Sequence, residues 1–346
     1  MQETIQFQMV ENWKDLFTSF FQAHQARQVF VLVDSKTKKH CLPKIQEALP
    51  NGFQLITIPH GEVHKTLETC SLVWDKLSGK NADRKAILLN LGGGVVGDLG
   101  GFCAATYKRG IDFIQIPTTL LAMVDASLGG KTGIDFQGFK NQVGVFRQPL
   151  DVWVDPSFLQ TLSETELISG FAEVVKHALI ADVQSWQLLR KKELHQQAWK
   201  DLIPASLRIK QAVVQQDPFE SGIRKTLNAG HTIGHAIETL LLQKGTPFPH
   251  GQCVAAGLIM ESFIACKNGL LPENELAQIE EFIYAQFEIL PIQKSWKTAI
   301  WKTILQDKKN ENQQVRMALI GPIGNCSIDV VVSQDEVNEA VGYYLG

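Results

Sequence analysis

The chain has 346 residues, of which 45% are hydrophobic and 20% charged, and its formal net charge is −3. The length favours two domains, because single hydrophobic cores rarely grow past about 250–300 residues, and the charge shows no basic footprint for nucleic acid. The first residues lack the regions of a signal peptide, and no apolar stretch approaches the ~20 residues of a membrane span. The six cysteines are scattered and form no CxxC pair. We therefore expect a cytoplasmic protein that binds neither nucleic acid nor membrane.

Four short apolar runs in the first 150 residues predict β-strands. They span residues 29–34, 53–58, 86–91 and 112–117, and stretches with helical periodicity separate them. Near-continuous apolar character is typical of strands covered on both faces, and strands that alternate with helices indicate a parallel sheet. We therefore predict an α/β fold whose first domain, residues 1–156, is a Rossmann-like parallel-sheet domain.

The strand pattern nearly disappears after the run DVWVDP at residues 151–156. The following segments carry apolar residues at helical spacing. A short strand pair is predicted late, at residues 315–321 and 326–332. We predict a mostly α-helical second domain over residues 157–346.

A glycine-rich loop follows the strand predicted at residues 86–91. Gly92, Gly94 and Gly97 match the pattern GxGxxG between a strand and a helix, where backbone N–H groups can approach a pyrophosphate. The alternative is a tight strand-to-helix turn without a ligand. No acidic residue convincingly fills the usual position about 20 residues downstream, but Asp34 ends an earlier strand and could bind ribose hydroxyls, which would favour NAD over NADP.

Three segments of the second half carry candidate metal ligands. Glu173, Lys176 and His177 are spaced to share one helix face, and so are Asn228, His231 and His235. His250 precedes an apolar helix. A HxxxH pair with a distant Glu and His could build a His₂Glu site with an open position for substrate, but HxxxH without the HExxH glutamate is more often incidental.

Several longer runs in register resemble the 3-dehydroquinate synthases. They are GGGVVGDLGGFCAATYKRGIDFIQIPTTLLAMVDASLGGKTGIDFQGFKN, GFAEVVKHALI, RKTLNAGHTIGHAIE and HGQCVAAGLIMES. The resemblance covers most of residues 30–320 and implies the dehydroquinate synthase-like fold. It also implies the conversion of 3-deoxy-D-arabino-heptulosonate 7-phosphate to 3-dehydroquinate and phosphate in the shikimate pathway of aromatic amino acid biosynthesis.

The family is a phosphorus–oxygen lyase that uses NAD catalytically together with a divalent metal, usually zinc, with cobalt as the alternative. Its reaction combines transient oxidation by NAD, phosphate elimination, reduction and an intramolecular aldol closure. By resemblance, the metal ligands are Glu173, His231 and His250, and the catalytic residues are Lys176, Glu220 and His235.

The resemblance also implies a cluster of residues around an anionic substrate. The matched positions are Arg109, Asp125, Lys131, Asn141, Lys176, Lys210, Arg224, Asn228, His235 and Lys309, with Lys308 as the alternative to Lys309. Lys210 and Arg224 are expected to hold the carboxylate, and Lys131, Asn141, Asn228 and the late lysine the phosphate. Arg109 is expected to reach the phosphate of a neighbouring subunit, which implies a homodimer.

The implied NAD contacts all lie in the first half of the chain. They are Asp34, Gly61, Glu62, Lys65, Gly93, Gly94, Val95, Gly97, Asp98, Thr118, Thr119, Lys140, Phe158 and Thr161. Three residues depart from the family pattern: Lys36 after the ribose-binding Asp34, and Asp135 and Phe139 beside Lys140.

Three alternatives compete with this interpretation. Other sugar-phosphate cyclases, which make inososes or valiolones, lack a substrate carboxylate and should lose the Lys210–Arg224 pair or Asn228, all of which are present here. A glycerol dehydrogenase-type polyol dehydrogenase needs no clamp for phosphate and carboxylate. A catalytically inactive NAD-binding regulator would not need the complete set of ligands and bases.

Overall fold

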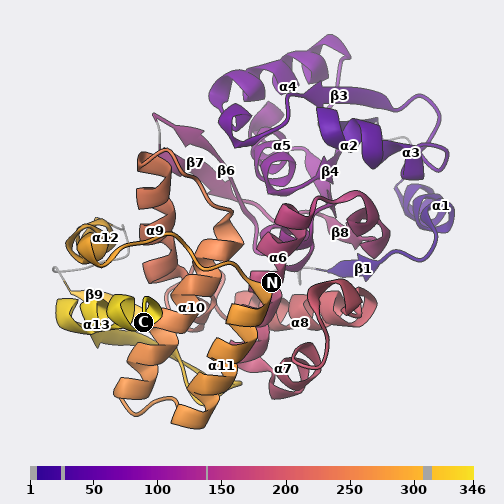
Figure 1. Ribbon diagram of the computed structural model, residues 1–346. Helices are drawn as coiled ribbons and strands as arrows, with labels where there is room; N and C mark the ends of the chain where they lie inside the picture. Colours follow the sequence, from indigo (N-terminus) through magenta and orange to yellow (C-terminus); the bar gives the residue numbers. More distant parts are fainter. Residues whose placement is uncertain (1–5, 25–27, 138, 307–313) are drawn as a thin grey trace. The chain divides into compact units, whose positions relative to one another are not determined.

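The computed structural model describes residues 6–24, 28–137, 139–306 and 314–346 (Figure 1). The chain forms two compact units, Met1–Ser163 and Glu164–Gly346. The first carries a parallel sheet and the second is mostly helical, which confirms the predicted fold class.

The N-terminal unit is built on a six-stranded sheet in which neighbouring strands run parallel. In spatial order the strands are β1 (Phe7–Met9), β8 (Asp151–Val154), β5 (Asp112–Pro117), β4 (Ile87–Gly92), β2 (Val29–Asp34) and β3 (Gln54–Ile58). β2, β4 and β8 are buried along their whole length. The four predicted strands are confirmed, with ends that move by one residue at most.

Helices cover both faces of this sheet. The helices of the unit are α1 (Trp13–Ala23), α2 (Ser35–His40), α3 (Leu42–Ile45), α4 (Leu67–Gly79) and α5 (Gly94–Thr106). The Gln115 side chain of β5 donates to the Gly97 carbonyl of α5 at 3.0 Å. Val152 pairs with Gln115, so Trp153, the next residue, points to the opposite face. There α1 packs Phe17 edge-on against Trp153 at 5.4 Å between ring centroids.

An antiparallel hairpin separate from the main sheet was missed by the sequence reasoning. It consists of β6 (Lys131–Phe136) and β7 (Phe139–Phe146) (Figure 1). The described residues of β7 are all exposed, so the strand carries no buried face that would produce an alternating pattern. The unit also has the short 3₁₀ helices η1 (Glu62–His64), η2 (Tyr107–Arg109) and η4 (Pro156–Thr161), and the π-helical segment η3 (Ala122–Ala126).

The C-terminal unit is a set of packed helices. They are α6 (Glu164–Ala181), α7 (Val183–Leu189), α8 (Trp199–Gln216), α9 (His231–Gln243), α10 (His250–Lys267), α11 (Glu273–Gln286), α12 (Lys297–Leu305) and α13 (Gln334–Tyr344), with turns η5 (Leu194–Gln196), η6 (Ile223–Asn228) and η7 (Lys294–Trp296). α10 is buried along most of its length and packs against α6, α9 and α13. Within the described residues, no helix is both long and apolar enough to cross a bilayer.

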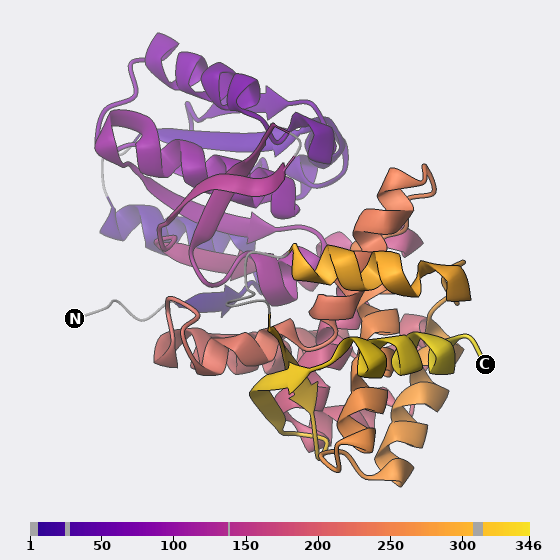
Figure 2. The ribbon, with the colours of Figure 1, turned by 90° about the vertical axis from the view of Figure 1, so that its left-hand side faces the viewer.

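The predicted late strand pair is confirmed as the hairpin of β9 (Val315–Ile320) and β10 (Cys326–Val332), drawn in yellow in Figure 2. β9 is buried at five of its six positions, and it contacts α10 and η6. The hairpin therefore packs against two elements, α10 and η6, that carry predicted site residues.

Candidate nucleotide and metal sites

The glycine-rich loop lies where β4 ends and α5 begins. Gly93 is the N-cap of α5 and supplies no side chain. A Cβ at Gly93 would lie 2.9 Å from Cγ2 of Thr119, so even a methyl group at this position would collide with Thr119. The N-terminus of this thirteen-residue helix carries unpaired N–H groups and the positive end of the helix dipole. The predicted contacts Gly94, Val95 and Gly97 all lie in its first turns. This geometry fits a pyrophosphate.

Asp34 lies at the carboxyl end of β2 and is 6% exposed. Its Oδ1 accepts a hydrogen bond from the Thr37 backbone at 2.7 Å and so caps α2, while His60 Nδ1 lies 3.1 Å from Oδ2. Asp34 therefore has a structural task besides the predicted ribose contact. His60 is thus a second partner of the Asp34 carboxylate. Lys36, the departure beside Asp34, is exposed.

Lys65, in the segment after β3, contacts both helix α5 and the β6–β7 hairpin. Its Nζ lies 2.6 Å from Asp98 Oδ2 and 2.6 Å from Asn141 Oδ1. Burial alone would lower the pKa of Lys65, but Asp98 raises it above the usual value. Three residues predicted to contact cofactor or substrate thus form one cluster within the unit.

The departure at Asp135 has a local role in the same hairpin. Asp135 Oδ1 accepts a hydrogen bond from the Asn141 backbone at 2.8 Å, and the Asp135 N–H donates to the Lys65 carbonyl at 2.8 Å. Asn141 has a φ of 51°, a conformation that this contact supports. The ring of Phe139, the other departure, is exposed. The hairpin therefore holds its shape with Asp135.

A buried carboxylate is the centre of the helical unit's candidate metal site. Glu173 on α6 is 1% exposed and forms an ion pair with Lys176 one turn later. Its Oε1 lies 3.3 Å from Nε2 of His231 and 3.8 Å from Nε2 of His250. The three predicted ligands, which come from α6, α9 and α10, are therefore brought together.

Hydrogen bonds fix which nitrogen of each histidine faces Glu173. His231 Nδ1 lies 3.0 Å from the Ala229 carbonyl, and His250 Nδ1 lies 2.9 Å from Glu238 Oε2. Because the partner of each Nδ1 is an acceptor oxygen, Nδ1 donates in each case, and Nε2 is the nitrogen that faces the carboxylate and could bind a metal ion. Two imidazole nitrogens and a carboxylate oxygen that converge in this way fit a divalent ion, and the acceptors at Nδ1 are the usual outer partners of metal-bound histidines.

The electrostatics of the cluster keep Glu173 and His231 in the form that binds a metal, but not His250. Burial would raise the pKa of Glu173, but the Lys176 ammonium holds it well below its usual range. Burial lowers the pKa of His231, and Lys176 acts in the same direction, which favours the neutral imidazole. Burial would also lower the pKa of His250, yet the bond to Glu238 raises it, so a metal must displace a proton there more often than at His231.

His235 lies beside this cluster. Its ring centroid is 5.0 Å from that of His231 and 5.4 Å from that of His250, and the three side chains offer nitrogens within 4.8 Å of one another. The spacing of His231 and His235 alone does not separate ligand from neighbour. The contacts of His231 and His250 with Glu173 favour these two as the ligands.

The loop after α8 and the following η6 carry three further predicted residues. Asn228 Nδ2 donates to Glu220 Oε1 at 2.8 Å, and buried Arg224 donates to the Pro218 carbonyl at 2.6 Å. Asp217, which the sequence reasoning did not single out, accepts backbone N–H bonds from Ser221, Gly222 and Arg224. Burial opposes the effect, but these bonds lower the pKa of Asp217 to about 2.

The remaining predicted residues differ in exposure. Lys210 on α8 is buried, as is Thr118 after β5, whereas Arg109, Lys131, Lys140 and Thr161 are exposed. Thr119, Asp125, Gly61 and Glu62 are at least partly exposed. Phe158 is 1% exposed and its ring lies 6.0 Å from that of Trp13, so the ring packs in the core and is not open to a cofactor. Lys308 and Lys309 lie outside the described residues.

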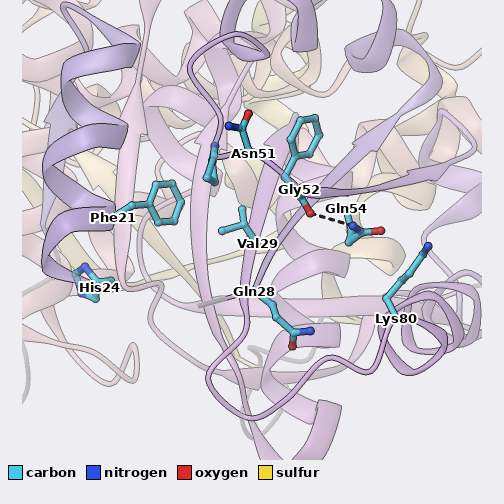
Figure 3. A pocket seen from close by; sticks show the side chains of 10 residues that line it. Phe21, His24, Gln28, Val29, Asn51, Gly52, Gln54 and Lys80 are labelled. Atoms are coloured by element: carbon cyan, nitrogen blue, oxygen red, sulfur yellow. Dashed lines mark hydrogen bonds between the residues drawn. The ribbon is translucent and has the colours of Figure 1, made fainter. Parts of the chain in front are cut away.

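A surface hollow of about 420 Å³ lies at the amino ends of β2 and β3 (Figure 3). Its lining includes Val29 and Gln54, the first residues of β2 and β3. Ligands of parallel α/β sheets bind at the carboxyl ends of the strands, and none of the predicted site residues lines this hollow. It is therefore not the nucleotide site.

Comparison with known proteins shows the family of the chain. The family model described as 3-dehydroquinate synthase N-terminal matches residues 55–169, and that described as 3-dehydroquinate synthase C-terminal matches residues 170–310. A curated 3-dehydroquinate synthase from Parabacteroides distasonis is 37% identical over 337 residues, which is 96% of this chain and 95% of the relative.

Solved structures agree on the architecture. A 2-epi-5-epi-valiolone synthase from Streptomyces hygroscopicus, with NAD⁺ and Zn²⁺ bound, has a TM-score of 0.86 and 25% identity, covering 100% of this chain and 98% of its own. A 2-deoxy-scyllo-inosose synthase, in complex with carbaglucose-6-phosphate, NAD⁺ and Co²⁺, has a TM-score of 0.83 and 24% identity, covering 97% of this chain and 95% of its own.

Proposed function

Because this chain belongs to the 3-dehydroquinate synthase family, we propose that it converts 3-deoxy-D-arabino-heptulosonate 7-phosphate to 3-dehydroquinate and phosphate. The observation that carries the proposal is the convergence of Nε2 of His231 and Nε2 of His250 on the buried carboxylate of Glu173. Full-length similarity to a curated synthase supports the same reaction. The net reaction is that of a phosphorus–oxygen lyase.

We assign Glu173, His231 and His250 as the ligands of a divalent ion, zinc or cobalt. When bound, the ion acts as a Lewis acid on a substrate oxygen. Lys176, 1% exposed and paired with Glu173, keeps the carboxylate ionised and places an ammonium group beside the ligands. We assign His235, which lies beside both ligand histidines, as a residue that exchanges a proton with the substrate.

Cations of the helical unit are assigned to the substrate carboxylate. Lys210 and Arg224 are buried, and such charges are retained in a fold where they meet anions. Glu220, hydrogen-bonded to Asn228, is assigned as the second proton acceptor. Lys131, Asn141, Asn228 and Lys309 are assigned to the phosphate, and Asp125 to a polar contact of the substrate.

NAD is assigned to the glycine loop and to Asp34 in the N-terminal unit. The α5 N-terminus would hold the pyrophosphate and Asp34 the ribose hydroxyls, which leaves Thr118, Thr119 and Lys140 as further donors. The bound dinucleotide supplies a hydride acceptor that is regenerated within the cycle. NAD⁺ in both synthase structures supports this assignment.

Exposed Arg109 is assigned to the substrate site of a second subunit in a homodimer. The protein is assigned to the cytoplasm.

The proposal is tested by incubating the purified protein with the heptulosonate phosphate, NAD and Zn²⁺. We expect phosphate and 3-dehydroquinate to form in equal amounts without accumulation of NADH, and chelation to stop both. Accumulating NADH without phosphate release would instead indicate a polyol dehydrogenase. No turnover by a protein that binds both NAD and metal would support the inactive regulator.

A further inference from the structure

The helix that carries His231 begins without a cap of its own. The N-cap residue of α9 is Gly230, in the left-handed conformation with φ of 77°, and no side chain at that position accepts a hydrogen bond. The first N–H groups of a helix have no partner inside it and need an external acceptor when they are buried. The start of α9 therefore depends on another element.

That acceptor is the carboxylate of Glu261 on α10. Its Oε2 accepts from the Gly230 N–H at 2.6 Å, and its Oε1 accepts from the Ile233 N–H at 2.9 Å. The two N–H groups lie on either side of His231 in the chain. Glu261 is 1% exposed, and a buried carboxylate is tolerated only where strong hydrogen bonds replace water. The dipole of α9 favours the charge further.

Glu261 also shares a helix face with the other histidine ligand. Glu261 follows His250 by eleven residues on α10, which is about three turns at 3.6 residues per turn. Both side chains thus point toward α9. One helix carries one ligand, His250, at its start and, three turns later, the group that fixes the residue before the second ligand, His231.

Glycines leave little freedom between the two helices. A Cβ at Gly257 of α10 would lie 2.0 Å from the Gly230 carbonyl oxygen, and one at Gly234 of α9 would lie 2.8 Å from the Cys253 carbonyl oxygen. The helices therefore touch backbone to backbone, without flexible side chains between them. In such a contact, the hydrogen bonds of Glu261 determine how α9 begins against α10.

We propose that Glu261 is a positioning residue of the metal site, which holds the first turn of α9 so that Nε2 of His231 meets Glu173. The proposal rests on the metal site of the proposed function. It does not place Glu261 in contact with the ion or the substrate.

The test is the metal affinity of Glu261→Gln, measured by competition with a chelating dye and by the visible spectrum of the Co²⁺-loaded protein. A glutamine has one acceptor oxygen, so one of the two N–H groups would face its NH₂ group. We expect the Kd for Zn²⁺ to rise about 10- to 100-fold, as when other outer partners of metal sites are removed, and the Co²⁺ spectrum to change. Excess metal should restore most of kcat.

Gln252→Ala is the matched control. Gln252 is a buried polar residue of the same helix, and it accepts from the Glu288 backbone at 3.1 Å, away from α9. We expect this variant to lose stability but to keep the parental metal affinity. An equal loss of affinity in the control would show general destabilisation and would overturn the proposal.

The proposal would also be overturned if Glu261→Gln kept the parental metal affinity and an unchanged Co²⁺ spectrum. The proposed function would then remain intact. A parent protein that binds no metal would instead remove the proposed metal site itself. If Glu261→Gln fails to fold, Glu261→Asp carries the same test, because it keeps the charge but withdraws the carboxylate from α9. Unchanged metal affinity in the aspartate variant would be decisive against the proposal.

Discussion

Glu238 of α9 accepts a hydrogen bond from Nδ1 of His250 on α10, with 2.9 Å between the two atoms. The contact fixes the imidazole so that its Nε2 faces Glu173. A carboxylate at this position also makes a metal-bound imidazole a stronger donor. Glu238 is therefore an outer partner of the candidate metal site, contributed by the same helix as His231.

Replacing Glu238 by Gln should weaken metal binding. The amide can still accept a hydrogen bond, but it lacks the charge that polarises the imidazole, so we expect about a 10- to 100-fold higher Kd for Zn²⁺. Because Glu238 also raises the pKa of His250, its loss reduces proton competition. The Kd should therefore be measured from about pH 7 to about 9, where the deficit should be clearest at the alkaline end. Gln243→Ala, an exposed position on α9, is the control, and equal affinities of parent and Glu238→Gln would contradict the role.

Replacing Asp34 by Ser should relax the choice between NAD and NADP. Serine keeps an N-cap acceptor for α2 but removes the charge that would repel a 2′-phosphate. At close range in a partly screened site such a repulsion is worth more than about 1.4 kcal/mol, so the ratio of NADP to NAD affinity should rise by about tenfold or more. Fluorescence titration of both nucleotides measures the ratio. A parent with equal affinity for both would contradict the ribose assignment.

Replacing Asp217 by Asn should destabilise the protein at neutral pH by about 1–2 kcal/mol, because charged acceptors of backbone N–H groups are lost. The pKa of Asp217 is lowered to about 2, below about 3.9 for an unfolded aspartate. A lowered pKa stabilises the fold above the unfolded value, and this contribution disappears as pH falls from about 4 to about 2. Urea unfolding at several pH values should show the difference between parent and variant shrinking in that interval. If the stability difference between parent and variant stayed constant over this pH interval, the effect would come from the packing of the side chain and not from its charge.

The sequence predicted the sheet because β2, β4 and β5 are apolar runs with clear ends, but it missed β7, whose described residues are exposed. The sequence predicted Glu173, His231 and His250 as the metal ligands only through the family resemblance, because helical spacing alone indicated the pair His231 and His235. Glu238, Glu261 and Asp217 were missed because a carboxylate on a helix or loop usually faces water. Their partners are far away in sequence or belong to the backbone, and no spacing pattern marks such contacts.

Arg224 should distinguish substrates by their carboxylate. A charge-assisted hydrogen bond is worth about 1.5–3 kcal/mol, so Arg224→Ala should lower kcat/KM for the heptulosonate phosphate about 10- to 150-fold. Any turnover of sedoheptulose 7-phosphate, which has no carboxylate, should change little. Equal losses for both sugars would mean that Arg224 acts by supporting the loop through its bond to Pro218.

The most direct test of the central claim is the ratio of kcat/KM for these two sugars in the unmodified protein, with NAD and Zn²⁺ present. We predict a strong preference for 3-deoxy-D-arabino-heptulosonate 7-phosphate, with 3-dehydroquinate as the product. A preference for sedoheptulose 7-phosphate, with a cyclitol ketone as the product, would contradict the account and identify a sugar-phosphate cyclase of the valiolone type.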